Sequence, residues 1–435
     1  MLYDNINFLK LEHIRNDIQS IETYSLDNIV YAKIILKSKH YSCPLCGSST
    51  HINGYFDKKI IHSTLTHSKS VIIYHARRFI CKSCGKRFFE HNPFSSKHDS
   101  ISSFTKLEVL NALKNHNATY TSIAARYNIS IKSVINIFDS FVECARKPLP
   151  EVLCIDEIFT AKISAYKFAC VWLDFNTNEI IDILPTRQKN YLRYHFERIS
   201  KNEREKVKYV VIDMYETYKE TALICLPNAL VAIDSFHVIR HINEAVKRVR
   251  IDIMNKYKNH KTFNHNDDWY YMLKKFHYFF VKDYGEISNK LIKIHKYNVS
   301  WSKSEIRSYL LSIDDDLKYA YELKEEYRYF NRTAIIRNEL DKEYAIEKLS
   351  ALIYKFRNSK FDCFRRVGKM LNSWSEYIIN SFYHVNKRRL SNGPIEGMNS
   401  KIKTIIKVSN GMRNFHRFRN RCMYSLNKNT PIKNL

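Results

Sequence analysis

The chain has 435 residues, of which 45% are hydrophobic, and its 71 Lys and Arg against 44 Asp and Glu give a net charge of +27. This length and apolar content allow two to four domains with sizeable cores and exclude a wholly disordered chain. The sequence shows no apolar run near the roughly 18 residues of a membrane span and no signal peptide, so we expect a cytoplasmic protein without membrane contact. The basic excess favours a polyanion such as nucleic acid. An acidic membrane surface is the alternative, but the sequence shows neither a basic amphipathic helix nor a lipidation signal.

Four of the ten cysteines form two C-x-x-C pairs, in the runs YSCPLCG and FICKSCG. Cys43 pairs with Cys46 and Cys81 pairs with Cys84, and a glycine follows each pair, as in the knuckles of a zinc ribbon. Four soft thiolates at this spacing suit one structural Zn²⁺. Two disulfides, free thiols or a redox dithiol are the alternatives. Because the run SVIIYHARRFI is strand-like, we expect residues 1–97 to form an N-terminal segment with a zinc ribbon.

After the second cysteine pair, apolar residues recur at helical spacing in three short groups. A short turn at Asn128-Ile129-Ser130 precedes the last group, and Ser130 is a natural helix cap. We therefore expect a DNA-binding helix-turn-helix over residues 98–148, with a helical bundle that acts as a spacer as the alternative. The residues expected to be exposed on the recognition helix are Ser130, Lys132, Ser133 and Asn136.

From residue 149 the sequence alternates strand-like and helical runs, which indicates an α/β domain. The strand-like runs are VLCIDEI, YKFACVWLDF, NEIIDILP, VKYVVIDM and the start of ALVAIDSFHVIR. Residues 251–385 have long, charged helical periodicity and a weak strand signal. We interpret them as an all-helical insertion that divides a catalytic domain into residues 149–250 and a closing helix with a basic tail, 386–435.

Two aspartates, Asp156 and Asp213, belong to buried strand runs, where a carboxylate is costly unless it is exposed or paired. Near the C-terminus, Glu396 is the one acid among twelve Lys and Arg residues between positions 381 and 435. Such carboxylates suggest a cluster for hard divalent ions, and two ions roughly 4 Å apart can promote phosphodiester transfer. Each acid also has a structural alternative, because an Asp can cap a helix and Glu396 can close a capping box.

Three other acids of the α/β region are not expected to belong to this cluster. Glu157 follows Asp156 directly, and successive side chains of a strand point to opposite faces. Asp174 and Asp182 flank a turn.

Glu396 opens a helix that leads into the basic tail. Pro394 suits the first helical position, which puts Glu396 in the first turn. Positions three, seven and eleven residues later share roughly its face. We expect these polar groups and the arginines that follow to contact DNA phosphates, with a solvated helix face as the alternative. They are Asn399, Lys403, Lys407, Arg413, Arg417, Arg419 and Arg421.

Taken together, these segments resemble the ISL3 family of bacterial insertion-sequence transposases, of the DDE class. The resemblance rests on CPLCG, CKSCGKRFF, the helix-turn-helix after them, CIDEI, VVIDMYETYKETALICLPNALVAIDSFHVIRHINEAVKRVR and SNGPIEGMNSKIKTIIKVSNGMRNFHRFRNR. It implies an RNase H-like domain interrupted by a helical insertion, with Asp156, Asp213 and Glu396 as the DDE triad. It also implies that Asp234 and His237 lie near the active site, where a helix cap and a first-turn histidine are the alternatives. The basic residue that usually follows this Asp in the family is Ser235 here.

The resemblance implies a transposase that binds transposon ends and uses Mg²⁺ or Mn²⁺, with two ions, for phosphodiester hydrolysis and strand transfer. Its partners would be double-stranded DNA and further copies of the chain, in a homodimer or higher oligomer on DNA. The location would be the bacterial cytoplasm, at the nucleoid when DNA is bound. A catalytically silent DNA-binding regulator derived from a transposase and another RNase H-like nuclease, such as a junction resolvase, are the competing hypotheses.

Overall fold

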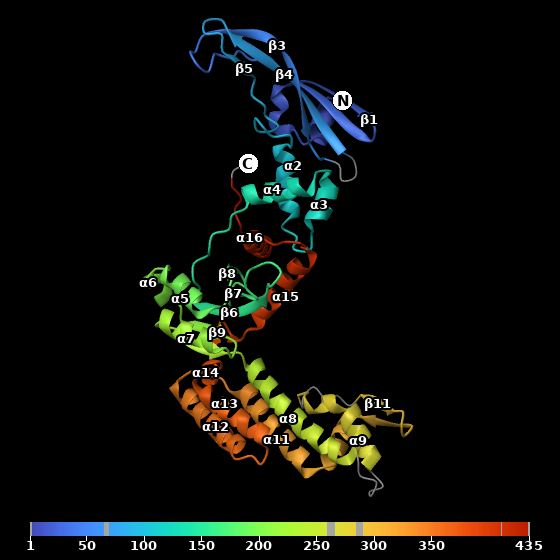
Figure 1. Cartoon of the computed structure of the whole chain (residues 1–435), viewed down its shortest axis with the longest axis vertical. Helices are drawn as coiled ribbons and strands as arrows, with labels where there is room; N and C mark the ends of the chain where they lie inside the picture. Colours follow the sequence, from blue (N-terminus) through green and yellow to red (C-terminus); the bar gives the residue numbers. More distant parts are fainter. Residues whose placement is uncertain (1, 65–68, 259–265, 284–289, 410, 434–435) are drawn as a thin grey trace. The chain divides into compact units, whose positions relative to one another are not determined.

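A computed structural model of the chain describes residues 2–64, 69–258, 266–283, 290–409 and 411–433. The chain divides into two compact units (Figure 1). The first, here called the N/C unit, comprises Met1–Arg146, Ala161–Ala165 and Asn399–Leu435. The second, the central unit, comprises Lys147–Thr160 and Tyr166–Met398. Among the helices of the described ranges, none combines the length and the apolarity that a membrane crossing requires.

The N/C unit begins with a five-stranded sheet. Helix α1 (Leu2–Phe8) and the 3₁₀ helix η1 (Glu12–Asp17) precede β1 (Ile18–Leu26), β2 (Ile29–Leu36), β3 (Thr50–Ile61), β4 (Lys69–Cys81) and β5 (Arg87–Phe89). The strand order is β1-β2-β4-β3. The short strand β5 pairs with the C-terminal end of β4. Ile34, Ile60 and Ile72 are fully buried, so the apolar face of the sheet forms its own core. The strands expected within residues 1–97 are confirmed.

Three helices follow the sheet, as the apolar spacing predicted: α2 (Ser103–Ala112), α3 (Tyr120–Tyr127) and α4 (Ile131–Phe141). Asn128 has the left-handed φ of 52° that the tight turn between α3 and α4 requires. Ser130 caps α4 by accepting a hydrogen bond from the Ser133 amide. The hydroxyl of Ser133 lies 2.9 Å from that of Ser130. Ser133 was expected to be exposed, but it is half-buried.

The C-terminal helix α16 (Phe415–Leu426) packs against these three helices. The buried guanidinium of Arg421 donates to the main-chain oxygens of Leu113, Asn115 and Ala118. The Tyr424 hydroxyl donates to the Leu110 carbonyl at 3.1 Å. Residues from Asn399 onward therefore lie in the N/C unit, whereas the sequence placed 386–435 in the catalytic domain. This difference arises because Arg421 joins segments about 300 positions apart, for which the sequence has no local signal.

The central unit is built on a second five-stranded sheet, in the order β10-β9-β6-β7-β8. Strands β6 (Val152–Phe159), β7 (Phe168–Asp174) and β8 (Ile180–Leu184) are antiparallel neighbours, and β9 (Tyr209–Ile212) and β10 (Leu230–Ile233) run parallel to β6. Helices α5 (Lys189–Glu197), α6 (Lys201–Glu205) and α7 (Glu216–Cys225) connect β8 to β9 and β9 to β10. The five predicted strand runs are confirmed.

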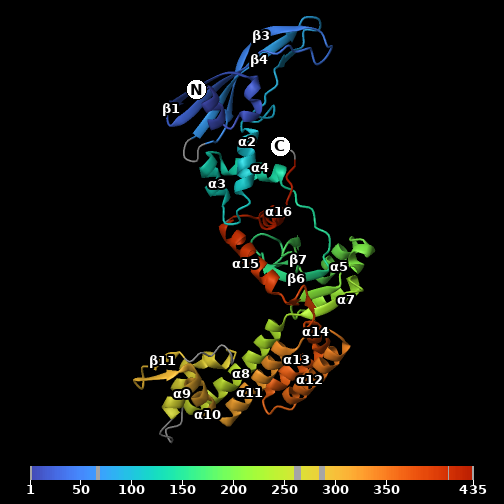
Figure 2. The ribbon, with the colours of Figure 1, turned by 180° about the vertical axis from the view of Figure 1, so that it is seen from behind.

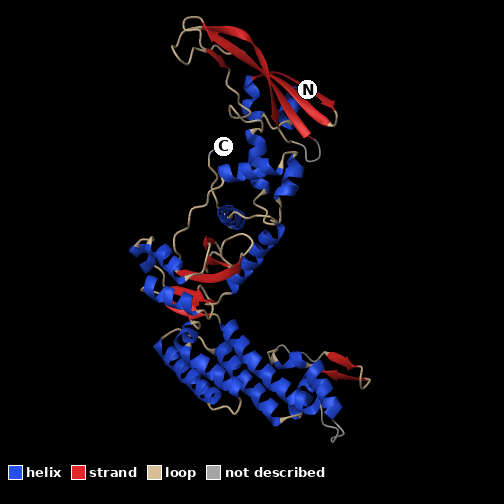
Figure 3. Ribbon diagram, in the orientation of Figure 1, coloured by secondary structure: helices blue, strands red, loops and turns tan. Residues whose placement is uncertain are grey.

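After β10 the chain is mainly helical (Figure 3). The elements are α8 (Ser235–Lys258), α9 (Asn266–Lys275), η2 (His277–Phe280), α10 (Lys303–Ser312), α11 (Asp315–Thr333), α12 (Glu339–Arg357), α13 (Asp362–Ser373), α14 (Ser375–Asn380), the short strands β13 (His384–Val385) and β14 (Arg388–Arg389), and α15 (Gly393–Val408). The boundary predicted between residues 250 and 251 falls inside α8, which runs without a break.

The insertion was predicted to be all-helical, and this is wrong at one hairpin. Strands β11 (Leu291–Ile294) and β12 (Val299–Ser302) pair antiparallel within it. Asn298, with a φ of 53°, lies in the turn between them. Both strands are only four residues long, and the first holds a single lysine among three apolar residues, so neither is long enough to show a two-residue period between the charged helices.

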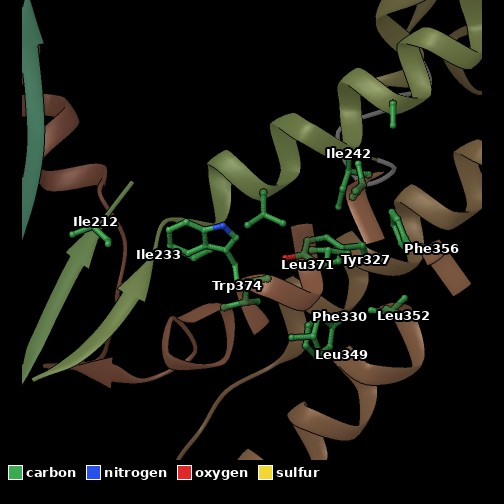
Figure 4. Close-up of a cluster of buried hydrophobic side chains, with 14 of the residues drawn as sticks. Ile212, Ile233, Ile242, Tyr327, Phe330, Leu349, Leu352, Phe356, Leu371 and Trp374 are labelled. Carbon is green, nitrogen blue, oxygen red and sulfur yellow. The ribbon is translucent and has the colours of Figure 1, made fainter. Parts of the chain in front are cut away.

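One hydrophobic core joins this sheet to the helices of the central unit. Figure 4 shows Trp374 near Ile233, with Leu371 and Tyr327 farther along the same cluster. Helix α8 lies beside α11 and α13 in both views (Figures 1 and 2). The sheet and the helical segment therefore form one packed body rather than two loosely linked domains.

Candidate active site and metal centres

The four predicted cysteines meet in the N/C unit. Sγ of Cys46 lies 3.5 Å from both Cys81 Sγ and Cys84 Sγ, and Cys43 Sγ lies 3.6 Å from Cys84 Sγ. A tetrahedral zinc site with Zn–S bonds of about 2.3 Å has sulfur–sulfur edges of roughly 3.8 Å, so the cluster fits one ion. All four thiols are free, which contradicts the disulfide alternative.

The two knuckles around the cysteines are built alike. Gly47 and Gly85 each have a φ of 69°, a left-handed conformation that glycine adopts without strain. Main-chain amides point at the sulfurs, from Leu45 to Cys43 at 3.4 Å and from Ser83 to Cys81 at 3.3 Å. Hydrogen bonding with Ser48 lowers the pKa of the Cys46 thiol to about 6, which favours the thiolate that binds metal.

The central sheet lines up three aspartates by its register. Ile212 pairs with Ile155 in β6 and with Ile233 in β10, all in parallel strands. The residues that follow these three isoleucines are Asp156, Asp213 and Asp234. Because each aspartate directly follows one of these paired isoleucines, the register brings the three residues to the same end of adjacent strands.

Two of the three proposed triad carboxylates come together, and an unpredicted one joins them. Among the described residues, Asp156, Glu157 and Asp213 each offer a carboxylate oxygen, and these oxygens lie within 4.8 Å of one another. Glu157 was expected on the opposite face, and for its carboxylate this is wrong. Its two oxygens accept hydrogen bonds from Arg187 at 2.8 Å and from the Tyr218 hydroxyl at 3.3 Å.

The third predicted carboxylate, Glu396, is not in this group. It is an exposed residue in the first turn of α15, the position that Pro394 predicted. Its amide donates to the main-chain oxygen of Asn392 at 2.9 Å, which begins the helix.

The pKa shifts in this group show what it costs to bury carboxylates side by side. Burial, and then the neighbouring Asp213 carboxylate, raise the pKa of Asp156 to about 7. Burial also raises the pKa of Glu157. His237 Nε2 lies 2.5 Å from Asp213 Oδ1, and the interaction with this carboxylate raises the pKa of His237. Acidic oxygens that are buried together in this way suit a hard divalent cation, which stabilises their charged forms.

Asp234, predicted to lie near the active site, links two elements. Its Oδ1 accepts a hydrogen bond from the Phe236 amide at 2.8 Å, so the helix cap named as the alternative role of Asp234 is present at the start of α8. Its Oδ2 accepts the amide of buried Asn392 at 2.9 Å, just before α15. The same carboxylate that follows β10 therefore fixes the start of the helix that carries Glu396.

The residues predicted to bind DNA differ in exposure. Lys132 and Asn136 on α4 and Lys403 and Lys407 on α15 are exposed, whereas Asn399 is buried. Met398, Ile402 and Ile405 of the same helix are buried.

Only one of the tail arginines predicted to contact DNA is clearly exposed. Arg413 lies on the surface. Arg417 Nε donates to the Asp139 carboxylate at 2.8 and 3.0 Å, and Arg419 donates to the Cys144 carbonyl at 2.6 Å. Arg417 and Arg419 therefore hold α16 against α4 and the segment after it, and their contact with DNA stays a prediction.

Sequence reasoning missed Glu157 and Arg187. The guanidinium of Arg187 lies 4.3 Å from the Phe168 ring centre and 4.6 Å from that of Tyr215. Arg187 occupies the loop that follows the buried strand β8. An arginine just after a buried strand was the sequence feature that could have marked it as a candidate site residue.

Comparison with known proteins points to one family. A family model for ISL3-type DDE proteins, described as "Transposase", matches residues 153–422, which is more than half of the chain. A curated protein, the transposase for insertion sequence element IS1001 of Bordetella parapertussis, is 30% identical over 107 residues. That match covers 24% of this chain and 26% of the relative, so the chain spans about a quarter of the relative's length in it. The range matched by the family model includes Asp156, Asp213 and Glu396.

Proposed function

The chain belongs to the ISL3 family of DDE transposases, and we propose that it is the transposase of an insertion sequence, which binds the element's ends and cuts and joins DNA strands. The observation that carries this proposal is the meeting of the Asp156 and Asp213 carboxylates at one end of a mixed sheet. A formal net charge of +27 suits a DNA substrate. We place this activity in the bacterial cytoplasm.

The proposed catalytic domain is RNase H-like, with the segment from α8 to α14 as its insertion. Three antiparallel strands followed by two strands parallel to the first support this assignment. Asp156, Asp213 and Glu396 are the proposed triad. Glu396 is supported by the hydrogen bond from Asn392 to Asp234, because Asp234 stands next to Asp213 in the register of the sheet.

The proposed reaction is attack on a phosphodiester by water, and then by a DNA 3′-hydroxyl. When bound, two Mg²⁺ or Mn²⁺ ions would supply Lewis-acid activation of the nucleophile and stabilisation of the leaving oxygen. Asp156, Asp213 and Glu396 would hold them. His237 forms an ion pair with Asp213 and would help to orient that carboxylate, in the way that partners behind a metal ligand usually do.

Recognition of the DNA is assigned to the N/C unit. We propose that α4 reads double-stranded DNA through Lys132, Asn136 and neighbouring Ser133, and that Lys403, Lys407 and Arg413 contact phosphates. Arg417, Arg419 and Asn399 belong to the same prediction, but their present contacts or burial make them weaker candidates. Transposon ends and target DNA would be bound by a homodimer or a higher oligomer.

A substitution of the third carboxylate tests the proposal. Glu396→Gln keeps the size of the side chain and removes the charge that a metal needs. In Mg²⁺, with duplexes that carry the repeats flanking the gene, the wild type should cut strands. Glu396→Gln should not cut, and should still shift the same duplex in a gel.

The matched control is Glu347→Gln, the same change at an exposed position on α12, which should cut as the wild type does. Normal cutting by Glu396→Gln would remove Glu396 from the triad. A wild type that binds the ends and never cuts would instead support the silent regulator.

A further inference from the structure

Arg187 occupies the loop between β8 and α5 and has no role in the proposal above. Its Nη1 lies 2.8 Å from Glu157 Oε1. The Glu157 carboxylate in turn belongs to the group whose oxygens lie within 4.8 Å of Asp156 and Asp213. A fixed positive charge therefore stands next to the carboxylates of the candidate active site.

The guanidinium is held in place by more than this ion pair. Rings of Phe168 and Tyr215 lie 4.3 and 4.6 Å from its central carbon. Such contacts restrict a long side chain and lower the entropy that it loses when it binds a ligand. The side chain nevertheless keeps 28% of its surface exposed. The planar group is thus pre-positioned and still reachable from solvent.

The chemistry of this arrangement suits a phosphodiester. Arginine presents five N–H donors in a fork that matches two oxygens of a phosphate. In the described part of the chain, the hydrogen bond found for Arg187 uses its Nη1. A DNA strand that approaches three clustered carboxylates meets repulsion, and a cation beside them offsets it.

We propose that Arg187 binds a phosphate of the DNA strand next to the carboxylate cluster, and that Glu157 is the positioning residue that orients it. This inference rests on the proposed function for the nature of the substrate. Its rival is that Arg187 only neutralises the buried charge of Glu157.

The test is equilibrium binding of a labelled duplex that carries the flanking repeat, in EDTA, at several salt concentrations. Arg187→Gln should weaken binding about tenfold and reduce the slope of log affinity against log salt by roughly one. Arg193→Gln is the control for the same charge change, because Arg193 on α5 has a side chain that is 42% exposed and lies 3.8 Å from Glu197. It should keep the wild-type affinity for the duplex.

The double variant Arg187→Gln/Glu157→Gln separates the two explanations, because it restores the charge balance of the pair. Binding that stays weak, with the reduced slope, supports a phosphate contact. Recovery of wild-type affinity, or a wild-type slope in Arg187→Gln itself, overturns the proposal. If thermal melting shows Arg187→Gln to be unfolded, Arg187→Lys is measured instead. Because a single ammonium cannot replace the fork, wild-type affinity in that variant also overturns the proposal.

Strand cutting is scored separately in Mg²⁺. A wild type that binds the duplex without cutting it would contradict the proposed transposase activity. The binding comparison would still decide whether Arg187 contacts DNA.

Discussion

Asp156 illustrates at the scale of one residue what a carboxylate costs in a buried site. Its pKa is raised to about 7, chiefly by burial and then by Asp213. Between pH 4 and pH 7 the folded chain keeps a proton here that the unfolded chain has lost, so stability falls as the pH rises. Above pH 7 the cost is complete, at most about 4 kcal/mol from the size of the shift.

Asp156→Asn should therefore stabilise the metal-free protein at pH 8 and change it little at pH 5. The reason is that the amide carries no charge to desolvate. Thermal melting in EDTA at the two pH values measures the effect. Addition of Mn²⁺ at pH 8 should raise the Tm of the wild type more than that of the variant. Equal melting of both proteins under all these conditions would show that Asp156 carries no such cost.

Asp234 acts through two hydrogen bonds rather than through a metal. Asp234→Asn replaces one acceptor oxygen with a donor, so either the Phe236 amide or the Asn392 amide loses its partner. We expect the start of α15 to loosen, and Mn²⁺ affinity and strand cutting to fall roughly tenfold, as for other residues behind a metal site. Titration with Mn²⁺ measures the loss of affinity, and melting in EDTA shows whether the variant is still folded. Unchanged Mn²⁺ affinity would show that the hydrogen bonds of Asp234 do not help to place Glu396 at the metal site.

Among the elements, the knuckles beside β3 and β4 carry the four cysteine sulfurs that could hold a metal ion. We propose that this is a structural site and expect about one zinc per chain by elemental analysis. Cys46→Ser should lose the zinc and make the ribbon sensitive to protease. The central unit should keep its melting transition, because none of its core residues comes from this sheet. Cys363→Ser, outside the cluster, is the matched control. Folded wild-type protein without zinc would exclude the ribbon.

The elements also show what the sequence could and could not predict. Strands β6 to β10 were predictable because their apolar runs are local and are bounded by turns. The packing of α16 on α2–α4 was not, because it depends on Arg421 and carbonyl groups in another part of the chain. Glu157 was misjudged by strand alternation, which describes where a Cβ points and not where a long side chain ends. Asp156 and Asp213 were proposed as partners from residue type, and their carboxylate oxygens lie within 4.8 Å of each other because the isoleucines before them pair in register.

At the scale of the whole molecule, the proposed catalytic residues and the proposed DNA-reading helices belong to different units. The proposed metal ligands Asp156, Asp213 and Glu396 belong to the central unit, whereas the cysteine cluster and helices α2–α4 belong to the N/C unit. Helix α15 starts in one unit and ends in the other, since the division falls between Met398 and Asn399. The carboxylate proposed to complete the site is therefore only a few residues along the chain from the unit that we propose binds DNA.

The distribution of charge gives the last prediction. Two arginines of the tail, Arg413 and Arg417, carry the same charge but differ in their partners, because Arg413 is exposed and Arg417 forms an ion pair with Asp139. The slope of log affinity against log salt is proportional to the number of protein cations that contact DNA phosphates. Arg413→Ala should therefore reduce this slope by about one. Arg417→Ala should change the slope less and lower the melting temperature more, because it breaks a contact between α16 and α4. Binding of one duplex across a range of salt, with melting curves for both variants, measures the difference. If Arg413→Ala keeps the wild-type slope, Arg413 does not contact the DNA, and the basic tail serves the packing of α16 instead.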